Sequence, residues 1–178
     1  MHANYCFTLP GLNNSGPEHW QTHWENKHGF RRIEQNEWDT PVCADWISTI
    51  ENTVTRCPLN EIVLIGHSLA CCAIVNWAAQ CKHIIKAALL VSPSDTEAAS
   101  FPPGTTGFVP MPLFKLPFPS IVVASSNDFY VTAERAEFFA YNWGSRLVEA
   151  GALGHINSAS GLGDWPQGYA ILQELISY

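Results

Sequence analysis

The chain has 178 residues, of which 47% are hydrophobic and 14% are charged. This length and composition predict one globular domain over residues 1–178 rather than a disordered chain. With 16 acidic and 9 basic residues the formal net charge is −7, which argues against a nucleic-acid partner because phosphate contacts need clustered lysine and arginine.

Targeting signals and cysteine spacing bear on location. No apolar run approaches the roughly 20 residues that a membrane-spanning helix needs. The first residues also lack the basic and long apolar parts of a secretion signal. We therefore expect a cytoplasmic protein without a membrane partner. The six cysteines show no C-x-x-C spacing, and we interpret them as reduced and mostly buried.

Short apolar runs alternate with amphipathic stretches, which predicts repeated β-α units. We expect strands at residues 3–9, 30–34, 61–65, 87–92, 120–124 and 145–148, and helices at 19–27, 41–55, 69–80, 133–142 and 166–176. Thr40 and Asp164 are the expected caps of the second and last helices. The strand segments are continuously apolar, so they should be buried on both faces of a mostly parallel sheet. The predicted fold class is α/β, with three layers, about six strands and helices on both faces of the sheet.

One long segment, residues 92–119, interrupts this alternation and holds seven of the twelve prolines. Loops of this length in compact domains are usually functional or disordered. We expect this one to form a wall of a site near the carboxyl edge of the sheet.

The sequence GHSLA at residues 66–70 follows an apolar run and precedes a run of small residues. It fits the pattern G-x-S-x-G except at Ala70, and alanine is still small enough for a sharp strand-to-helix turn. On such a turn Ser68 would present its hydroxyl beside a helix N-terminus, where negative charge is stabilised. The alternative is an ordinary β-α turn with a capping serine, which the flanking strand and helix signals disfavour.

A nucleophilic serine needs a base and an acid that orients it, and on α/β-hydrolase scaffolds the order is serine, acid, histidine. His155, in a small-residue loop after the last expected strand, is the candidate base. His83 lies just before a strand and therefore at the wrong edge of a parallel sheet. Asp128 is the candidate acid, and Asp95, which follows the preceding strand, is its rival.

An oxyanion hole needs two backbone N–H groups. We expect the Leu69 amide to supply one, and Leu12 or Asn13, in the loop after the first strand, to supply the other. Gly11 gives this loop the backbone freedom to approach a substrate. The candidate substrate contacts, all in this loop or beside the nucleophile, are Gly11, Asn14 and His67.

Four runs extend over most of the chain: LPGLNNSGPEHWQTHWE, GHSLA, LPFPSIVVASSNDFYV and GALGHINSASGLGDWPQG. In these runs the chain resembles the small α/β-hydrolase family of retinoblastoma-binding protein nine and its bacterial serine hydrolase relatives. The resemblance implies an α/β-hydrolase core without a cap domain, and a triad of Ser68, Asp128 and His155. The resemblance supplies the reaction class, and together with the triad residues it leads us to predict a carboxylesterase-like serine hydrolase that cleaves carboxylic esters or related small acyl substrates and requires no cofactor.

Two departures from the family pattern matter. Phe129 stands after the candidate acid, where such proteins often have proline. The L-x-C-x-E pattern for binding the retinoblastoma protein is absent, because LACCA has Ala73 in place of glutamate. That partner is therefore not carried over to this chain.

Other functions remain as alternatives. A hydrolase-fold binding or scaffold protein with a dormant triad is the main one, and a flavodoxin-like cofactor binder is another.

His19 and His23 have the i, i+4 spacing of a helical metal pair. No glutamate or further ligand cluster accompanies them, so we interpret them as solvated helix residues and predict no metal site.

Overall fold

The computed structural model describes residues 5–177. Within them, six strands form one sheet in the order β2-β1-β3-β4-β5-β6, with every neighbouring pair parallel. The strands are β1 (Cys6–Leu9), β2 (Arg31–Arg32), β3 (Val63–His67), β4 (Ala87–Val91), β5 (Ser120–Ala124) and β6 (Arg146–Glu149). The α-helices are α1 (Trp20–His28), α2 (Cys43–Val54), α3 (Leu69–Cys81), α4 (Ala133–Trp143) and α5 (Pro166–Ile176). Short 3₁₀ helices lie at η2 (Leu59–Glu61) and η3 (Ser158–Ser160).

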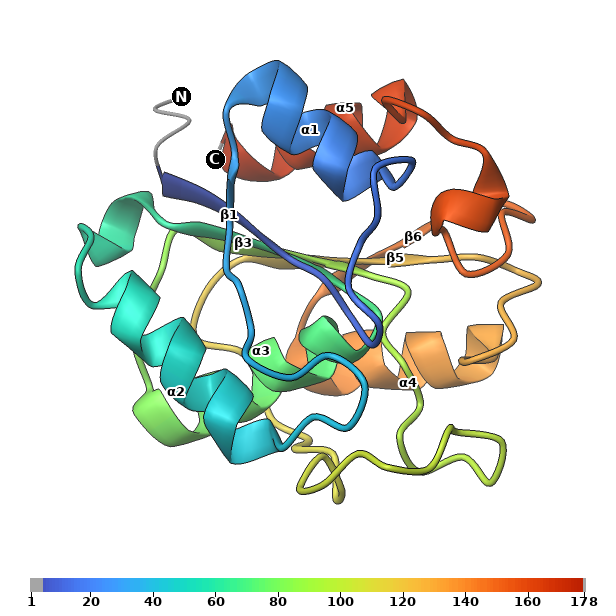
Figure 1. Ribbon diagram of the computed structural model, residues 1–178, viewed down its shortest axis with the longest axis horizontal. Coiled ribbons are helices and arrows are strands. Elements are labelled where there is room, and N and C mark those ends of the chain that lie inside the picture. Colours follow the sequence, from blue (N-terminus) through green and yellow to red (C-terminus); the bar gives the residue numbers. More distant parts are fainter. Residues whose placement is uncertain (1–4, 178) are drawn as a thin grey trace.

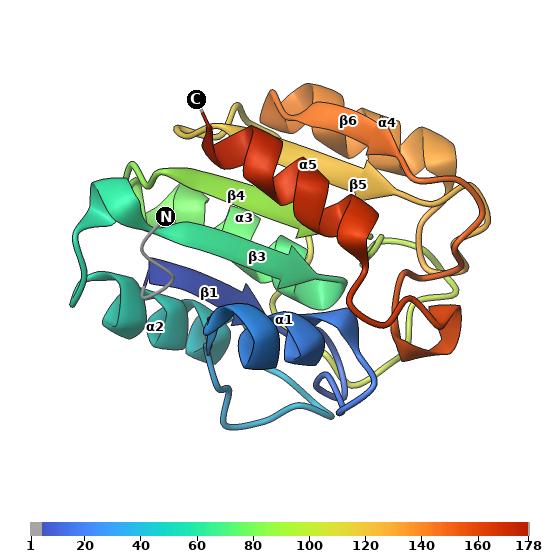
Figure 2. The ribbon, with the colours of Figure 1, turned by 90° about the horizontal axis from the view of Figure 1, so that it is seen from above.

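The helices form a layer on each face of the sheet. Figures 1 and 2 show α1 and α5 on one face and α2, α3 and α4 on the other. Every residue of β1, β3, β4 and β5 is buried, as expected for a parallel sheet covered on both sides. The predicted three-layer α/β fold is confirmed, and residues 5–177 contain no separate cap domain. No helix among these residues has the length and apolar character needed to cross a membrane.

The second helix begins later than expected, at Cys43, with Val42 as its N-cap. Val42 forms a parallel bridge with Thr106, and the Cys43 amide donates to the Thr106 carbonyl at 2.8 Å. These contacts with the long loop keep the chain extended through Val42, so Thr40 does not cap the helix.

The prediction that Asp164 caps the last helix is also wrong. The N-cap of α5 is Trp165, which makes no side-chain capping bond, and Pro166 occupies the start of the helix, where its missing N–H is not needed. The Asp164 carboxylate instead pairs with Lys27 and with His23 of α1. The expected strand at residues 30–34 is limited to β2, and residues 3–4 of the first expected strand lie outside the described part.

The strand order places several loops at one edge of the sheet. From β1 the chain passes to β2 on one side and then to β3 on the other, so the order reverses between β1 and β3. Crevices at the carboxyl ends of strands at such a reversal are the usual ligand sites of open α/β sheets. The loops that follow β1, β3, β4, β5 and β6 all meet there.

Candidate active site

The turn between β3 and α3 holds Ser68 at φ 57° and ψ −126°, a conformation that residues other than glycine rarely adopt. The strand ends at His67 and the helix begins at Leu69, so the chain reverses at Ser68 alone. A Cβ atom at Gly66 would lie 2.7 Å from Ile74 Cδ1, so a larger residue beneath the turn would force the Ile74 side chain to move. The Ser68 hydroxyl therefore lies at the carboxyl end of a central strand and at the N-terminus of α3.

Side chains from three different loops meet at this turn. His155 Nε2 lies 2.7 Å from Ser68 Oγ, and His155 Nδ1 lies 2.9 Å from both carboxylate oxygens of Asp128. A carboxylate only accepts, so Nδ1 carries the proton of the neutral ring and Nε2 accepts from the Ser68 hydroxyl. The Asp128 side chain is 0% exposed and the His155 side chain 9% exposed. The arrangement can move a proton from the serine to the imidazole.

The loop that carries His155 is fastened to the loop after β5. The Leu153 amide donates to Ser125 Oγ at 2.9 Å, and the Gly154 amide donates to Asn127 Oδ1 at 2.7 Å. Ser125 Oγ in turn donates to Asn127 Oδ1 at 2.9 Å. The segment that supplies the carboxylate therefore also fixes the backbone beside the imidazole.

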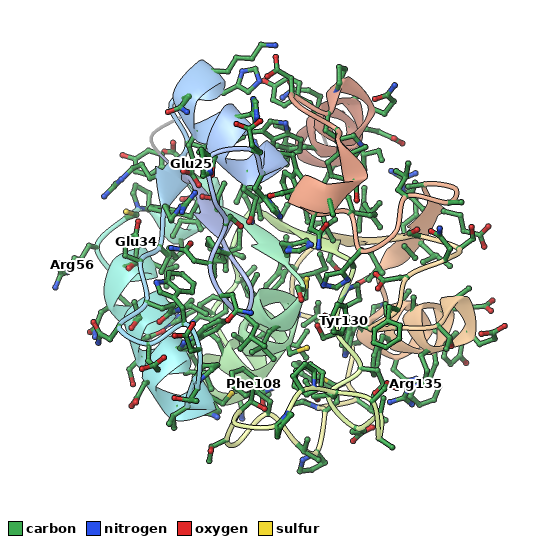
Figure 3. The ribbon with its side chains drawn as sticks, turned by 45° about the vertical axis from the view of Figure 1, so that its right-hand side comes forward. Glu25, Glu34, Arg56, Phe108, Tyr130 and Arg135 are labelled. Carbon is green, nitrogen blue, oxygen red and sulfur yellow. The ribbon has the colours of Figure 1, made fainter. Side chains whose placement is uncertain are left out.

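The rival acid, Asp95, is engaged elsewhere. Its carboxylate oxygens accept from Nε and Nη2 of Arg135, both at 2.9 Å. This hydrogen bonding raises the pKa of the Arg135 guanidinium. Figure 3 shows Arg135 and Tyr130 on the side of the molecule that carries α4. Of the two candidate carboxylates, Asp128 is the one in contact with the imidazole.

Two further buried histidines lie near His155: His67 contacts it, and His19 packs against His67. His67 Nε2 donates to the His155 carbonyl at 2.9 Å, and burial holds the His67 pKa well below its usual range. The expectation that His19 is solvated is wrong, since His19 is 3% exposed and its ring packs edge-on against that of His67. Its Nδ1 caps α1 by accepting from the Gln21 amide, and burial lowers its pKa to about 3. Both rings are therefore neutral near pH 7 and place no positive charge beside His155.

Gly11 is buried against the turn at Ser68 and is not among the residues that line the cavity described below, so its contact with substrate stays a prediction. A Cβ atom at this position would lie 2.7 Å from Ser68 Cβ and 2.9 Å from the His67 carbonyl oxygen. Glycine is needed here because the loop after β1 packs directly against the backbone of the turn at Ser68.

Backbone amides near Ser68 are the candidate oxyanion donors. Leu69 is the first residue of α3, so its N–H has no acceptor within the helix. The Asn13 amide donates to the Trp38 carbonyl at 2.9 Å, which rules it out as the second donor. Of the two residues predicted for that position, Leu12 remains.

A cavity of about 440 Å³ opens in front of Ser68. Phe101 and Pro102 of the long loop line it, as expected of a wall-forming segment, and the predicted contacts Asn14 and His67 line it too. Ser94 of the same long loop lines the cavity as well, and four lining residues from other loops at the carboxyl edge were not predicted, namely Tyr130, Asn157, Ser158 and Ala159. Among the described residues, its wall contains no lysine, arginine, aspartate or glutamate.

This combination of a parallel sheet, a strained nucleophile turn and a later carboxylate and histidine defines an α/β-hydrolase. Comparison with known families agrees. The chain belongs to the serine hydrolase family, whose model matches residues 6–174, and the protein is accordingly a hydrolase. The predicted relationship to bacterial serine hydrolases is thereby confirmed.

Several solved structures are similar to this chain over nearly its whole length. A protein described as a YdeN-like hydrolase from Pectobacterium atrosepticum is 31% identical with a TM-score of 0.85, covering 97% of this chain and 90% of that one. The ydeN gene product of Bacillus subtilis is 18% identical with a TM-score of 0.75, covering 98% and 100%. Est1E from Butyrivibrio proteoclasticus is 16% identical with a TM-score of 0.72, covering 98% and 89%. The latter two share the fold, and a comparison with curated proteins gives no match.

Proposed function

We propose that this protein hydrolyses carboxylic esters or related small acyl compounds, in the manner of a carboxylesterase, through a Ser68–His155–Asp128 triad. The observation that carries the proposal is the 2.7 Å contact between Ser68 Oγ and His155 Nε2, with the Asp128 carboxylate on the opposite ring nitrogen. Ser68 attacks the carbonyl carbon while His155 takes its proton, and Asp128 holds the imidazole tautomer and stabilises the imidazolium.

The remaining steps use the same groups. The amides of Leu69 and Leu12 stabilise the oxygen that becomes negative in the tetrahedral intermediate. His155 then protonates the leaving alcohol, and a serine ester is left on the protein. A water molecule that loses its proton to His155 attacks this ester and releases the acid. These reaction steps require no cofactor.

The cavity wall bears on the substrate class. Its lining combines apolar side chains with neutral amides and hydroxyls and, within the described part of the chain, contains no lysine, arginine, aspartate or glutamate. Its volume is about 440 Å³, in the range of small-ligand pockets. These features support a small, uncharged ester. We also propose a cytoplasmic location, which is supported by the reduced state of five cysteines in the described part of the chain, namely Cys43, Cys57, Cys71, Cys72 and Cys81.

The proposal is tested with p-nitrophenyl acetate, butyrate and octanoate, matching anilides, and a fluorophosphonate probe. Ser68→Ala and His155→Ala should each lower kcat by about 10⁴- to 10⁶-fold, and Ser68→Ala should abolish labelling. Ser48→Ala, at an exposed hydroxyl on α2, is the control and should behave as the wild type. A folded wild-type protein that neither reacts with the probe at Ser68 nor cleaves any ester would support a dormant binding protein instead.

A further inference from the structure

A second serine hydroxyl lies against the proposed nucleophile, and the mechanism above does not use it. Ser94 Oγ is 2.9 Å from Ser68 Oγ. Ser94 is 1% exposed and contributes to the wall of the cavity. It belongs to the loop after β4, the strand that pairs with β3 in the sheet.

The available protons determine the direction of this hydrogen bond. Ser68 has one hydroxyl proton, and His155 Nε2 at 2.7 Å accepts it, because the other ring nitrogen donates to the Asp128 carboxylate. Ser68 Oγ can therefore act only as the acceptor toward Ser94, whose hydroxyl has to donate. The nucleophile gives its proton to one partner and receives a hydrogen bond from another.

Contacts outside the triad hold Ser94 in place. Its carbonyl accepts from Cys72 Sγ at 3.3 Å. The amide of the next residue, Asp95, donates to the Tyr130 carbonyl at 3.0 Å, and the Asp95 carboxylate is held by Arg135. A donor that is fixed before the reaction needs no reorganisation when charge develops on its acceptor.

The same contact explains an unusual feature of α3. Ser68 is the N-cap residue of this helix, yet its side chain makes no capping bond. A serine at this position commonly accepts from an amide of the first helical turn. Oγ is instead held between His155 and Ser94, so the hydroxyl is not tied to the helix that follows it.

We propose that Ser94 is a further catalytic residue, whose hydroxyl holds Ser68 Oγ against His155 and stabilises the negative charge that grows on Oγ during attack. The inference rests on the proposed ester hydrolysis. As the bond from Oγ to the carbonyl carbon forms, the Ser68 proton moves to His155 and the carbonyl electron pair moves onto its oxygen. Ser94 keeps its own proton throughout, and its hydrogen bond is strongest in the transition state, where Oγ has given up its proton but is not yet fully bonded to carbon and is therefore partly negative.

The test compares Ser94→Ala and Ser94→Cys with wild type, by kcat and KM for p-nitrophenyl acetate and by the rate of fluorophosphonate labelling. Cysteine is close in size to serine but is a poor donor. Both variants should lower kcat and the labelling rate by about 10- to 100-fold while KM changes little. Ser94→Thr, which keeps the hydroxyl, should recover most of the labelling rate.

Ser92→Ala is the matched control. Ser92 lies in the same loop, is 0% exposed, and its hydroxyl has no hydrogen-bond partner among the described residues. Its removal should leave kcat, the labelling rate and Tm close to wild type.

If Ser94→Ala and Ser94→Cys leave kcat and the labelling rate unchanged in an active protein, the role of Ser94 is refuted and the proposed function stands. If their activity falls only in parallel with Tm, the role of Ser94 is likewise refuted. A wild type that neither labels nor hydrolyses would overturn both proposals.

Discussion

Two four-residue segments at the carboxyl edge share their first and last residues but make different contacts. Residues 92–95 after β4 read SPSD, and residues 125–128 after β5 read SSND. Both end in an aspartate whose side chain is largely buried. In the first loop the carboxylate binds Arg135 of α4, and in the second it binds His155.

Strand order explains the difference. The loop after β4 lies beside β3, so its serine reaches the nucleophile turn. The loop after β5 lies beside β6, which leads into the segment that carries His155, so its carboxylate and amide reach the base. Two similar loops therefore act on opposite ends of one proton relay, because their strands have different neighbours.

The largest expected effect comes from removing the charge in the second loop. Asp128→Asn keeps the size of the side chain but no longer requires a proton on His155 Nδ1, so the ring can adopt the wrong tautomer. We expect kcat to fall by about 10⁴-fold, the magnitude known from other triads, with thermal stability little changed. Steady-state kinetics with p-nitrophenyl acetate and a thermal melt measure both, and near-normal turnover would contradict the assignment of the acid.

A smaller effect should follow from loosening the base without touching the triad. Asn127→Ala removes the acceptor for the Gly154 amide, so the segment that carries His155 loses an anchor. We expect kcat to fall by about 10- to 100-fold, because Nε2 spends less time in line with Ser68. Ser126→Ala, at an exposed neighbouring side chain whose backbone bond to Gly151 is retained, is the control. Equal losses in both variants would mean that the loop as a whole, rather than Asn127, matters.

The fold and the core of the site followed closely from the sequence. Apolar runs and their spacing predicted the parallel sheet, and small residues around Ser68 predicted the turn, because only such residues allow so tight a reversal. The order of Ser68, Asp128 and His155 was readable because each follows a strand, and the carboxyl ends of parallel strands share one edge. The structure brings these three side chains into contact.

The remaining features depended on contacts between distant segments. Nothing local shows that the Trp38 carbonyl accepts from the Asn13 amide, or that Gly11 packs against the turn at Ser68. His19 was predicted to be a solvated helix residue, whereas tertiary packing buries it against His67. The contact of Ser94 with Ser68 was not predicted, because residues 92–95 do not themselves show that β3 pairs with β4.

The smallest expected effect on catalysis is that of Asp95→Asn, the counterpart of Asp128→Asn in the first loop. Arg135 would lose a bidentate partner but keep Glu97 at 2.8 Å, and its side chain is already 31% exposed. We therefore expect unfolding free energy to fall by about 1–2 kcal/mol, measured by urea denaturation. The value of kcat/KM should fall by less than about tenfold, because only the anchoring of Ser94 is disturbed.

Glu97→Gln, which removes the more exposed partner of Arg135, should cost less stability. A loss as large as that of Asp128→Asn would assign the orienting acid to the first loop and reverse the division between the two loops.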